Sequence, residues 1–193
     1  EDNIEPKLDY LQQKLLLDDK ALKKLVSSAT NVLTVSIEEN IKPKLNWLQE
    51  RLDLDEKELA KIITKFPVIL HYSLEENLEP TLDWLQQRLE LSDTALSKMI
   101  QLNPQILIYS IPDNLEPKLN WLQQRLEMSD TEISKLIQKW PAILCLSIPD
   151  NIEPKLDWIH QRLCLTDEEL SKLIQKLPPL LGCNIGTNIE PTI

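Results

Sequence analysis

Basic and aromatic side chains recur in this sequence of 193 residues at a fixed spacing of 37 residues. One basic series consists of Lys14, Arg51, Arg88, Arg125 and Arg162. A second consists of Lys7, Lys44, Lys118 and Lys155, with Thr81 in the missing place. The aromatic series consists of Tyr10, Trp47, Trp84, Trp121 and Trp158. Cations interleaved with indole rings could follow a phosphate backbone, so these two basic series and the four tryptophans are candidate nucleic-acid-binding residues.

The spacing within one repeat places these side chains together on a helix. Lys118, Trp121 and Arg125 are related as i, i+3 and i+7, which is one stripe of an α-helix. Packed helices lie about 8–10 Å apart, so the stripe would present one cation about every 10 Å. A structural interpretation is also possible, in which the arginines pair with carboxylates of the next repeat and the tryptophans pack between repeats. The sequence leaves both interpretations open.

A third basic series has the same spacing. It consists of Lys24, Lys61, Lys98, Lys135 and Lys172, accompanied by Lys65, Lys139 and Lys176. These residues fall in the later part of the second helix expected in each repeat, where the helix dipole favours positive charge. We therefore interpret the third series as structural.

The sequence contains no pattern typical of a catalytic or metal-binding site. His71 and His160 occupy different repeat positions, and neither has a partner at the spacing of metal ligands. Cys145, Cys164 and Cys183 form no Cys-x-x-Cys motif, and unpaired cysteines indicate a reducing compartment. The carboxylates recur on faces expected to be exposed. We therefore expect a non-enzymatic protein with no metal and no cofactor.

Composition limits the class of protein further. With 42% hydrophobic and 27% charged residues, the chain is expected to fold. Two glycines argue against phosphate-cradling loops. No apolar run approaches the roughly 20 residues that a membrane span needs, so we expect no membrane insertion, and the chain contains no targeting segment. Its 21 basic and 31 acidic residues give a net charge of −10, which favours a basic protein partner.

The repeat spacing defines the domain organisation. An asparagine opens each repeat, and a proline follows three residues later, as in Asn114 and Pro117. The expected domain is a single array over residues 1–193. Its repeats are 3–39, 40–76, 77–113, 114–150 and 151–187, with a partial sixth at 188–193.

Each repeat has the pattern of two helices. In the fourth, a leucine stripe runs through Leu115, Leu119, Leu122 and Leu126. Ser110 and Asp113 resemble a capping box. A helix that started at Ser110 would contain Pro117 and be kinked, whereas a start at Glu116 would put that proline in the first turn. We favour a short capped turn, a bend and then the main helix.

The second helix of this repeat is expected to open at a capping box, Ser129 with Glu132, and to stop before Pro141. Residues 141–144 then read as a 3₁₀ turn leading into the next repeat. Neither helix can bury its apolar stripe alone, so neighbouring repeats must stack. The expected fold class is all-α, an α-solenoid of about five repeats with two antiparallel helices and a short 3₁₀ turn each.

Two motifs per repeat carry a family resemblance. One is the stretch Asn-Leu-Glu-Pro-Lys-Leu-Asn-Trp-Leu at 114–122, and the other is Pro-Ala-Ile-Leu at 141–144. Together they resemble the mTERF family, named for the mitochondrial transcription termination factors, along the entire chain. The resemblance implies a superhelix of repeats in a mitochondrion or plastid that binds double-stranded DNA or RNA. The chain departs from the family in its acidity, pI ≈ 4.8, and in lacking a glycine ahead of the second helix.

The resemblance favours a protein that binds double-stranded nucleic acid and regulates transcription or RNA metabolism in an organelle. The alternative is an acidic protein-binding scaffold, or a peripheral subunit of an organellar complex, with a basic partner. The regular placement of lysine and arginine favours the first, and the net charge favours the second.

Overall fold

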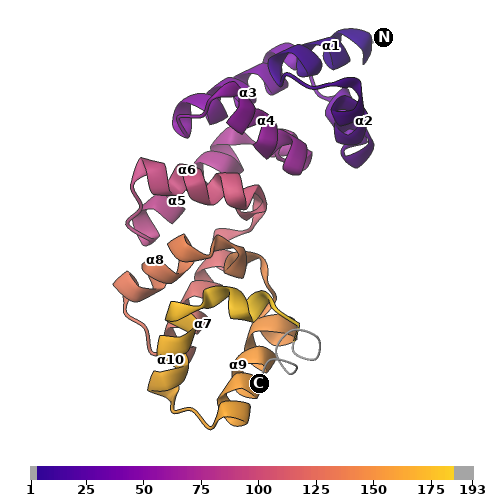
Figure 1. The fold of residues 1–193 in the computed structure, drawn as a ribbon. Coiled ribbons are helices and arrows are strands. Elements are labelled where there is room, and N and C mark those ends of the chain that lie inside the picture. The colour runs from indigo at the N-terminus through magenta and orange to yellow at the C-terminus, as the bar shows by residue number, and fades with distance from the viewer. Residues whose placement is uncertain (1–3, 185–193) are drawn as a thin grey trace. The chain divides into compact units, whose positions relative to one another are not determined.

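The computed structural model describes residues 4–184, and every regular element in that range is helical (Figure 1). The main helices of the five repeats are α1 Ile4–Lys14, α3 Lys42–Arg51, α5 Glu79–Arg88, α7 Glu116–Arg125 and α9 Glu153–Leu163. The second helices are α2 Asp19–Ser28, α4 Glu56–Lys65, α6 Asp93–Leu102, α8 Asp130–Lys139 and α10 Asp167–Lys176. The expected all-α repeat fold is confirmed.

Each main helix from α3 onwards is entered through a capped π-helical turn. In the fourth repeat this turn is Ile111–Leu115, and the Ser110 side chain accepts a hydrogen bond from the backbone of Asp113. The turn continues into α7, with Pro117 near its start. Proline cannot donate a backbone hydrogen bond and crowds the preceding turn, and the wider π turn relieves this crowding. The expected capped turn is confirmed. Leu115 and Glu116 both have helical backbone angles, so this turn runs directly into α7 in place of the expected bend.

The second helices begin and end as the sequence predicts. Ser129 and Glu132 form the reciprocal capping box at the start of α8. The helix ends at Lys139, because Pro141 holds Trp140 outside the helical region, at φ −147° and ψ 77°. The 3₁₀ turn Pro141–Cys145 follows. Its equivalents are Thr30–Thr34, Pro67–His71, Pro104–Ile108 and Pro178–Gly182.

The link from a main helix to its second helix passes through one residue in the left-handed region. These residues have φ between 48° and 50° and are Leu16, Asp53, Glu90, Glu127 and Cys164. This conformation favours glycine. This chain places five residues other than glycine there.

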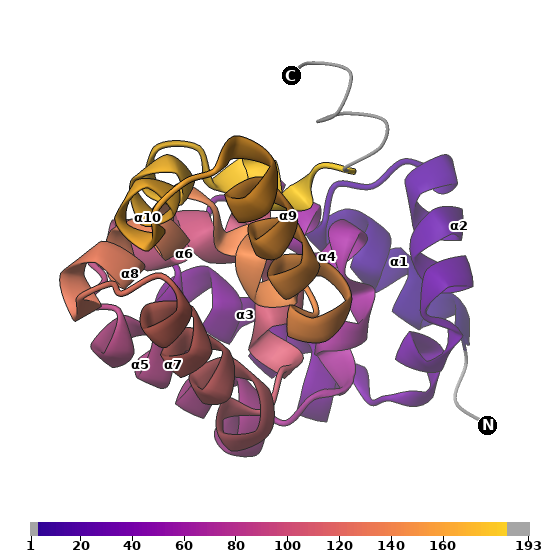
Figure 2. The same ribbon diagram turned by 90° about the horizontal axis from the view of Figure 1, so that it is seen from below.

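The core consists of the apolar stripes of both helices and the 3₁₀ turns between them. Leu115, Leu119, Leu122 and Leu126 are all buried. The described residues form two compact units, one holding residues up to 87 with 91–108, the other holding 88–90 with 109 onwards. In the first unit α4 contacts both α2 and α6, and in the second α10 contacts α8 (Figure 2). Within each unit, burial comes from stacking of adjacent repeats.

Two sequence expectations concern more than the described residues. The partial sixth repeat, 188–193, and the repeat asparagines Asn3 and Asn188 lie outside them. The single array over residues 1–193 stays a prediction. Between residues 4 and 184, no helix is both long and apolar enough to cross a membrane.

Candidate nucleic-acid interface

The lysines of the second basic series point into the protein. Lys44 is 4% exposed, and its Nζ donates hydrogen bonds to the Leu70 carbonyl at 2.5 Å and to Asn40 Oδ1 at 2.9 Å. A buried ammonium needs such acceptors because it has lost its hydration. The same bond to a carbonyl 26 residues later is made by Lys7, Lys118 and Lys155. These lysines therefore connect four of the main helices, α1, α3, α7 and α9, to the 3₁₀ turn at the end of the same repeat.

Burial changes the pKa of two of these lysines. It lowers the pKa of Lys44 and of Lys118, because a buried ammonium is less well solvated than an exposed one. The repeat asparagine is explained by the same contact, since Asn114 and Asn151 also accept from the lysine four residues later. In the third repeat Thr81 replaces the lysine, and Asn77 instead accepts from the Ser73 backbone.

The arginines of the first series bridge to the next repeat. Arg51 donates to Asp83 at 2.9 Å and to Gln86 at 2.7 Å, and its side chain is 23% exposed. Arg88 reaches Asp130 at 2.8 Å and Gln123 at 2.6 Å. These contacts tie the main helix of one repeat to both helices of the following one.

The fourth repeat makes the same bridge, whereas the first and fifth differ. Arg125 pairs with Asp157 at 2.9 Å and Asp167 at 3.5 Å. For Lys14, Asn46 stands in the position equivalent to Asp83, and the lysine donates to Gln49 at 3.2 Å. Arg162 is exposed, and no residue in the described part of the chain pairs with it.

The structure places the candidate residues differently from the expected solvent-facing row. Lys7, Lys44 and Lys118 are buried, and Lys155 is half-buried. Trp47, Trp84, Trp121 and Trp158 are half-buried. The cation–π contacts among the described residues pair lysine with tyrosine, Lys42 with Tyr10 and Lys118 with Tyr109, not arginine with tryptophan. The assignment of these residues to nucleic-acid binding stays a prediction, and the contacts that they make in the structure are internal.

The third basic series is exposed, and its interpretation as structural stays a prediction. Lys24, Lys61 and Lys98 lie on the surface, and no carboxylate within the described residues pairs with them. Lys65 also lies on the surface and donates to the Leu102 carbonyl. Because helix ends commonly carry lysine for the dipole alone, the sequence gives no sign that some of these lysines line a groove.

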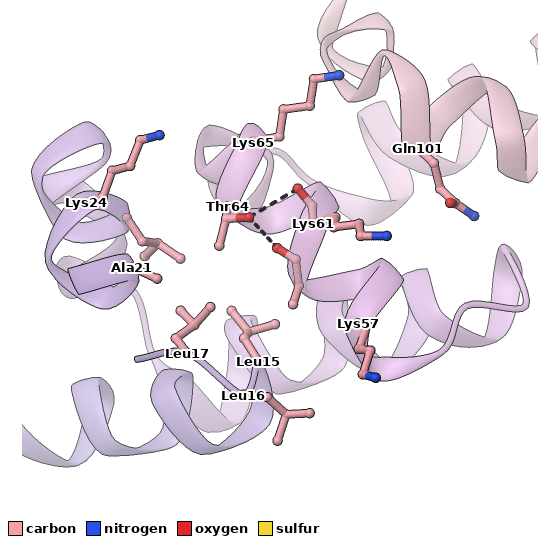
Figure 3. A pocket seen from close by; sticks show the side chains of 12 residues that line it. Leu15, Leu16, Leu17, Ala21, Lys24, Lys57, Lys61, Thr64, Lys65 and Gln101 are labelled. Carbon is pink, nitrogen blue, oxygen red and sulfur yellow. Dashed lines mark hydrogen bonds between the residues drawn. The ribbon is translucent and has the colours of Figure 1, made fainter. Parts of the chain in front are cut away.

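One groove of about 800 Å³ between α2 and α4 is lined by Lys24, Lys57, Lys61 and Lys65 (Figure 3). We call it the lysine groove. Lys24 comes from α2, and Lys57, Lys61 and Lys65 come from α4. Its apolar side is formed by the leucines at the link between α1 and α2, residues 15–17. No carboxylate lines it within the described part of the chain.

The equivalent groove one repeat later has the opposite charge. It measures about 280 Å³ between α4 and α6 and contains one lysine, Lys98. Asp53, Glu58 and Asp93 also line it. In the second unit, Lys172 pairs with Glu168, and Lys139 donates to the Lys176 carbonyl at 2.5 Å. Within the described residues, lysines therefore cluster without carboxylates at the lysine groove.

Over residues 4–184, no group of three or more histidine, cysteine, aspartate or glutamate side chains is arranged to hold a metal ion.

Comparison with known proteins identifies the fold family. The mTERF family model matches residues 1–125 and 88–193, two overlapping segments that together span the chain. No curated protein matches the sequence. The helix pairs, the 3₁₀ turns and the two motifs of each repeat agree with this match, and the chain belongs to the mTERF family.

Proposed function

We propose that this chain is a non-enzymatic protein that binds double-stranded DNA or RNA in a mitochondrion or plastid, where it regulates transcription or RNA metabolism. Membership of the mTERF family suggests a nucleic-acid-binding repeat protein and supports the proposal. The contacts to phosphate are made by the exposed lysines of the second helices, above all at the lysine groove.

One observation carries this assignment: among the described residues, the cations that lie exposed without a partner are on the second helices, apart from Arg162 on α9. Phosphate contacts require side chains that can exchange water and counterions for the nucleic acid. Lys44 and Arg51 already hold internal partners, whereas Lys24, Lys57 and Lys61 are exposed.

The net charge of −10 does not prevent this binding. At physiological salt the Debye length is about 8 Å, so exposed carboxylates further away than this contribute little to the potential at the groove. The potential at the groove is therefore set by the charges close to it, and the groove is lined by four lysines and no carboxylate.

The test is a salt titration of duplex DNA and duplex RNA binding, from about 50 to about 200 mM. Each lysine that contacts a B-DNA phosphate adds about 0.9 to the steepness of the log–log plot. Lys24→Gln and Lys61→Gln should each flatten the plot by about this amount. Lys172→Gln is the matched control, because this lysine has the same repeat position but is paired with Glu168.

No binding to either duplex at low salt would contradict the proposal. So would binding whose slope is the same in the wild type and in both lysine variants. The acidic scaffold with a basic partner would then be the function to examine.

A further inference from the structure

We propose that the lysine groove also receives an acidic amphipathic helix of a partner protein, which competes with the nucleic acid for the same lysines. The competition rests on the proposed function, but the binding of the helix does not. The helix would place leucine-type side chains on the apolar side of the groove and carboxylates against its lysines.

The apolar side of the groove is the first observation. Leu16 is 61% exposed and Leu17 is half-buried, above the buried Leu15 and Leu25. A phosphate backbone is charged and gains no binding energy from contact with leucine side chains. An amphipathic helix binds through apolar anchors at i, i+3, i+4 and i+7, which need a groove of this kind.

The exposure of Leu16 is a property of its position. The residues at the same place in later repeats, Asp53, Glu90 and Glu127, are exposed too. All of these residues have the left-handed backbone, which a branched apolar side chain adopts at a cost. A leucine is therefore unfavourable here both for solvation and for backbone geometry.

Two further positions also make the lysine groove more positive than the equivalent groove one repeat later. Ala21 replaces an acidic residue, which is Glu58 one repeat later, and Lys57 replaces Thr94. Together with Leu16, these residues turn an acidic groove into a basic groove with an apolar side. The complementary occupant has an apolar stripe flanked by negative charge.

The direct test uses the full chain and a synthetic helical peptide with leucines at i, i+3, i+4 and i+7 and glutamates on the flanking positions. Fluorescence anisotropy measures its affinity without nucleic acid present. A peptide with glutamine for glutamate and one with the leucine order scrambled are the controls. We expect both to bind at least tenfold more weakly.

The matched variant is Leu16→Asp with Ala21→Glu and Lys57→Thr, which introduces only residues that other repeats carry at these positions. It should keep the fold, because aspartate tolerates the left-handed region and the glutamate introduced by Ala21→Glu would complete a capping box with Asp18. We expect a loss of peptide affinity of at least a hundredfold. Lys135→Thr, in the second unit, should have no effect.

A variant that leaves the charge of the groove unchanged distinguishes peptide binding from duplex binding. Leu16→Asn removes the apolar anchor, keeps the charge and suits the left-handed backbone. It should weaken the peptide about tenfold and leave duplex affinity unchanged. In a mixture, the glutamate peptide should displace a labelled duplex from the wild type but not from the matched variant.

Three results would overturn the inference. These are equal binding of the scrambled peptide, an unchanged affinity in the matched variant, and binding to vesicles of anionic lipid but to neither the glutamate peptide nor its controls. If the peptide binds and neither duplex does, the helix site stands, whereas the competition and the proposed function both fail.

Discussion

The cations of the main helices and those of the second helices have the same 37-residue spacing but opposite surroundings. Lys44 and Arg51 meet acceptors placed by the fold, the Leu70 carbonyl and Asp83. Lys61 and Lys98 lie on the surface without a carboxylate partner in the described residues. Regular spacing therefore reflects only the repeat. Whether a cation stabilises the fold or is available to a ligand depends on the acceptors that lie within hydrogen-bonding distance of it.

The largest effect should come from the buried lysines. Lys44→Ala removes the donor to a buried carbonyl and leaves a cavity, so we expect the free energy of unfolding to fall by about 2–3 kcal/mol. Lys61→Ala should change it by less than about 0.5 kcal/mol. Urea unfolding of the two variants measures both changes, and equal losses would show that burial of Lys44 contributes nothing to stability.

The arginine bridges should contribute less, because they are partly exposed. Arg51→Ala loses two bonds to the next repeat, and we expect a cost of about 1 kcal/mol. Arg162→Ala should cost almost nothing, since this arginine is exposed and no described residue pairs with it. The difference in urea midpoint between these two variants isolates the bridge. A loss in Arg162→Ala as large as in Arg51→Ala would show that the bridges contribute nothing.

Titration of Lys44 should make its contribution depend on pH. Burial lowers its folded pKa below 10.5, so between the folded and unfolded pKa values the unfolded state binds more protons. Stability from this group therefore rises with pH in that window, by less than about 1.4 kcal/mol per pH unit. Below the window both states are protonated, and the full cost of burying the charge remains.

The measurement is the stability of the wild type relative to Lys44→Met between about pH 8 and 10, a range that approaches the unfolded pKa of lysine. The wild type should gain relative to the variant as pH rises. A gain of the same size in Lys61→Met would show that the effect belongs to lysine in general and not to burial.

The smallest effect concerns the left-handed links. Glu90→Gly relieves a φ of 48° at an exposed position, and we expect it to stabilise the fold by about 0.5 kcal/mol after the entropy cost of glycine. Thermal unfolding measures the change. Glu116→Gly, inside α7, is the control and should instead destabilise the protein by about 1 kcal/mol. Destabilisation by both variants would contradict this account of the link.

Much of the fold follows from the sequence. The leucine stripe through Leu119 and Leu122, the cap at Ser129 and the stop before Pro141 are local features, because each involves residues only a few positions apart. The turn before Pro117 was anticipated as capped but not as a π turn continuous with α7, since a proline in the first turn fits more than one helix start.

The candidate site was harder to predict, because its contacts are distant in sequence. The sequence places Lys118 on a stripe with Arg125, but the acceptor of Lys118 is a backbone carbonyl 26 residues later. No residue pattern shows where a carbonyl points. The lysine groove was missed for a related reason: Leu16 and Lys57 lie in different repeats, and only stacking brings them to one groove.

The central claim is that second-helix lysines, and not main-helix arginines, meet the phosphates. Its most direct test is the salt dependence of duplex DNA binding by two double variants, each shown to be folded by circular dichroism. Lys24→Gln with Lys61→Gln should flatten the log–log slope by about 1.8, whereas Arg51→Gln with Arg88→Gln should leave it unchanged. A flattened slope in the arginine variant, with the wild-type slope in the lysine variant, would contradict the account.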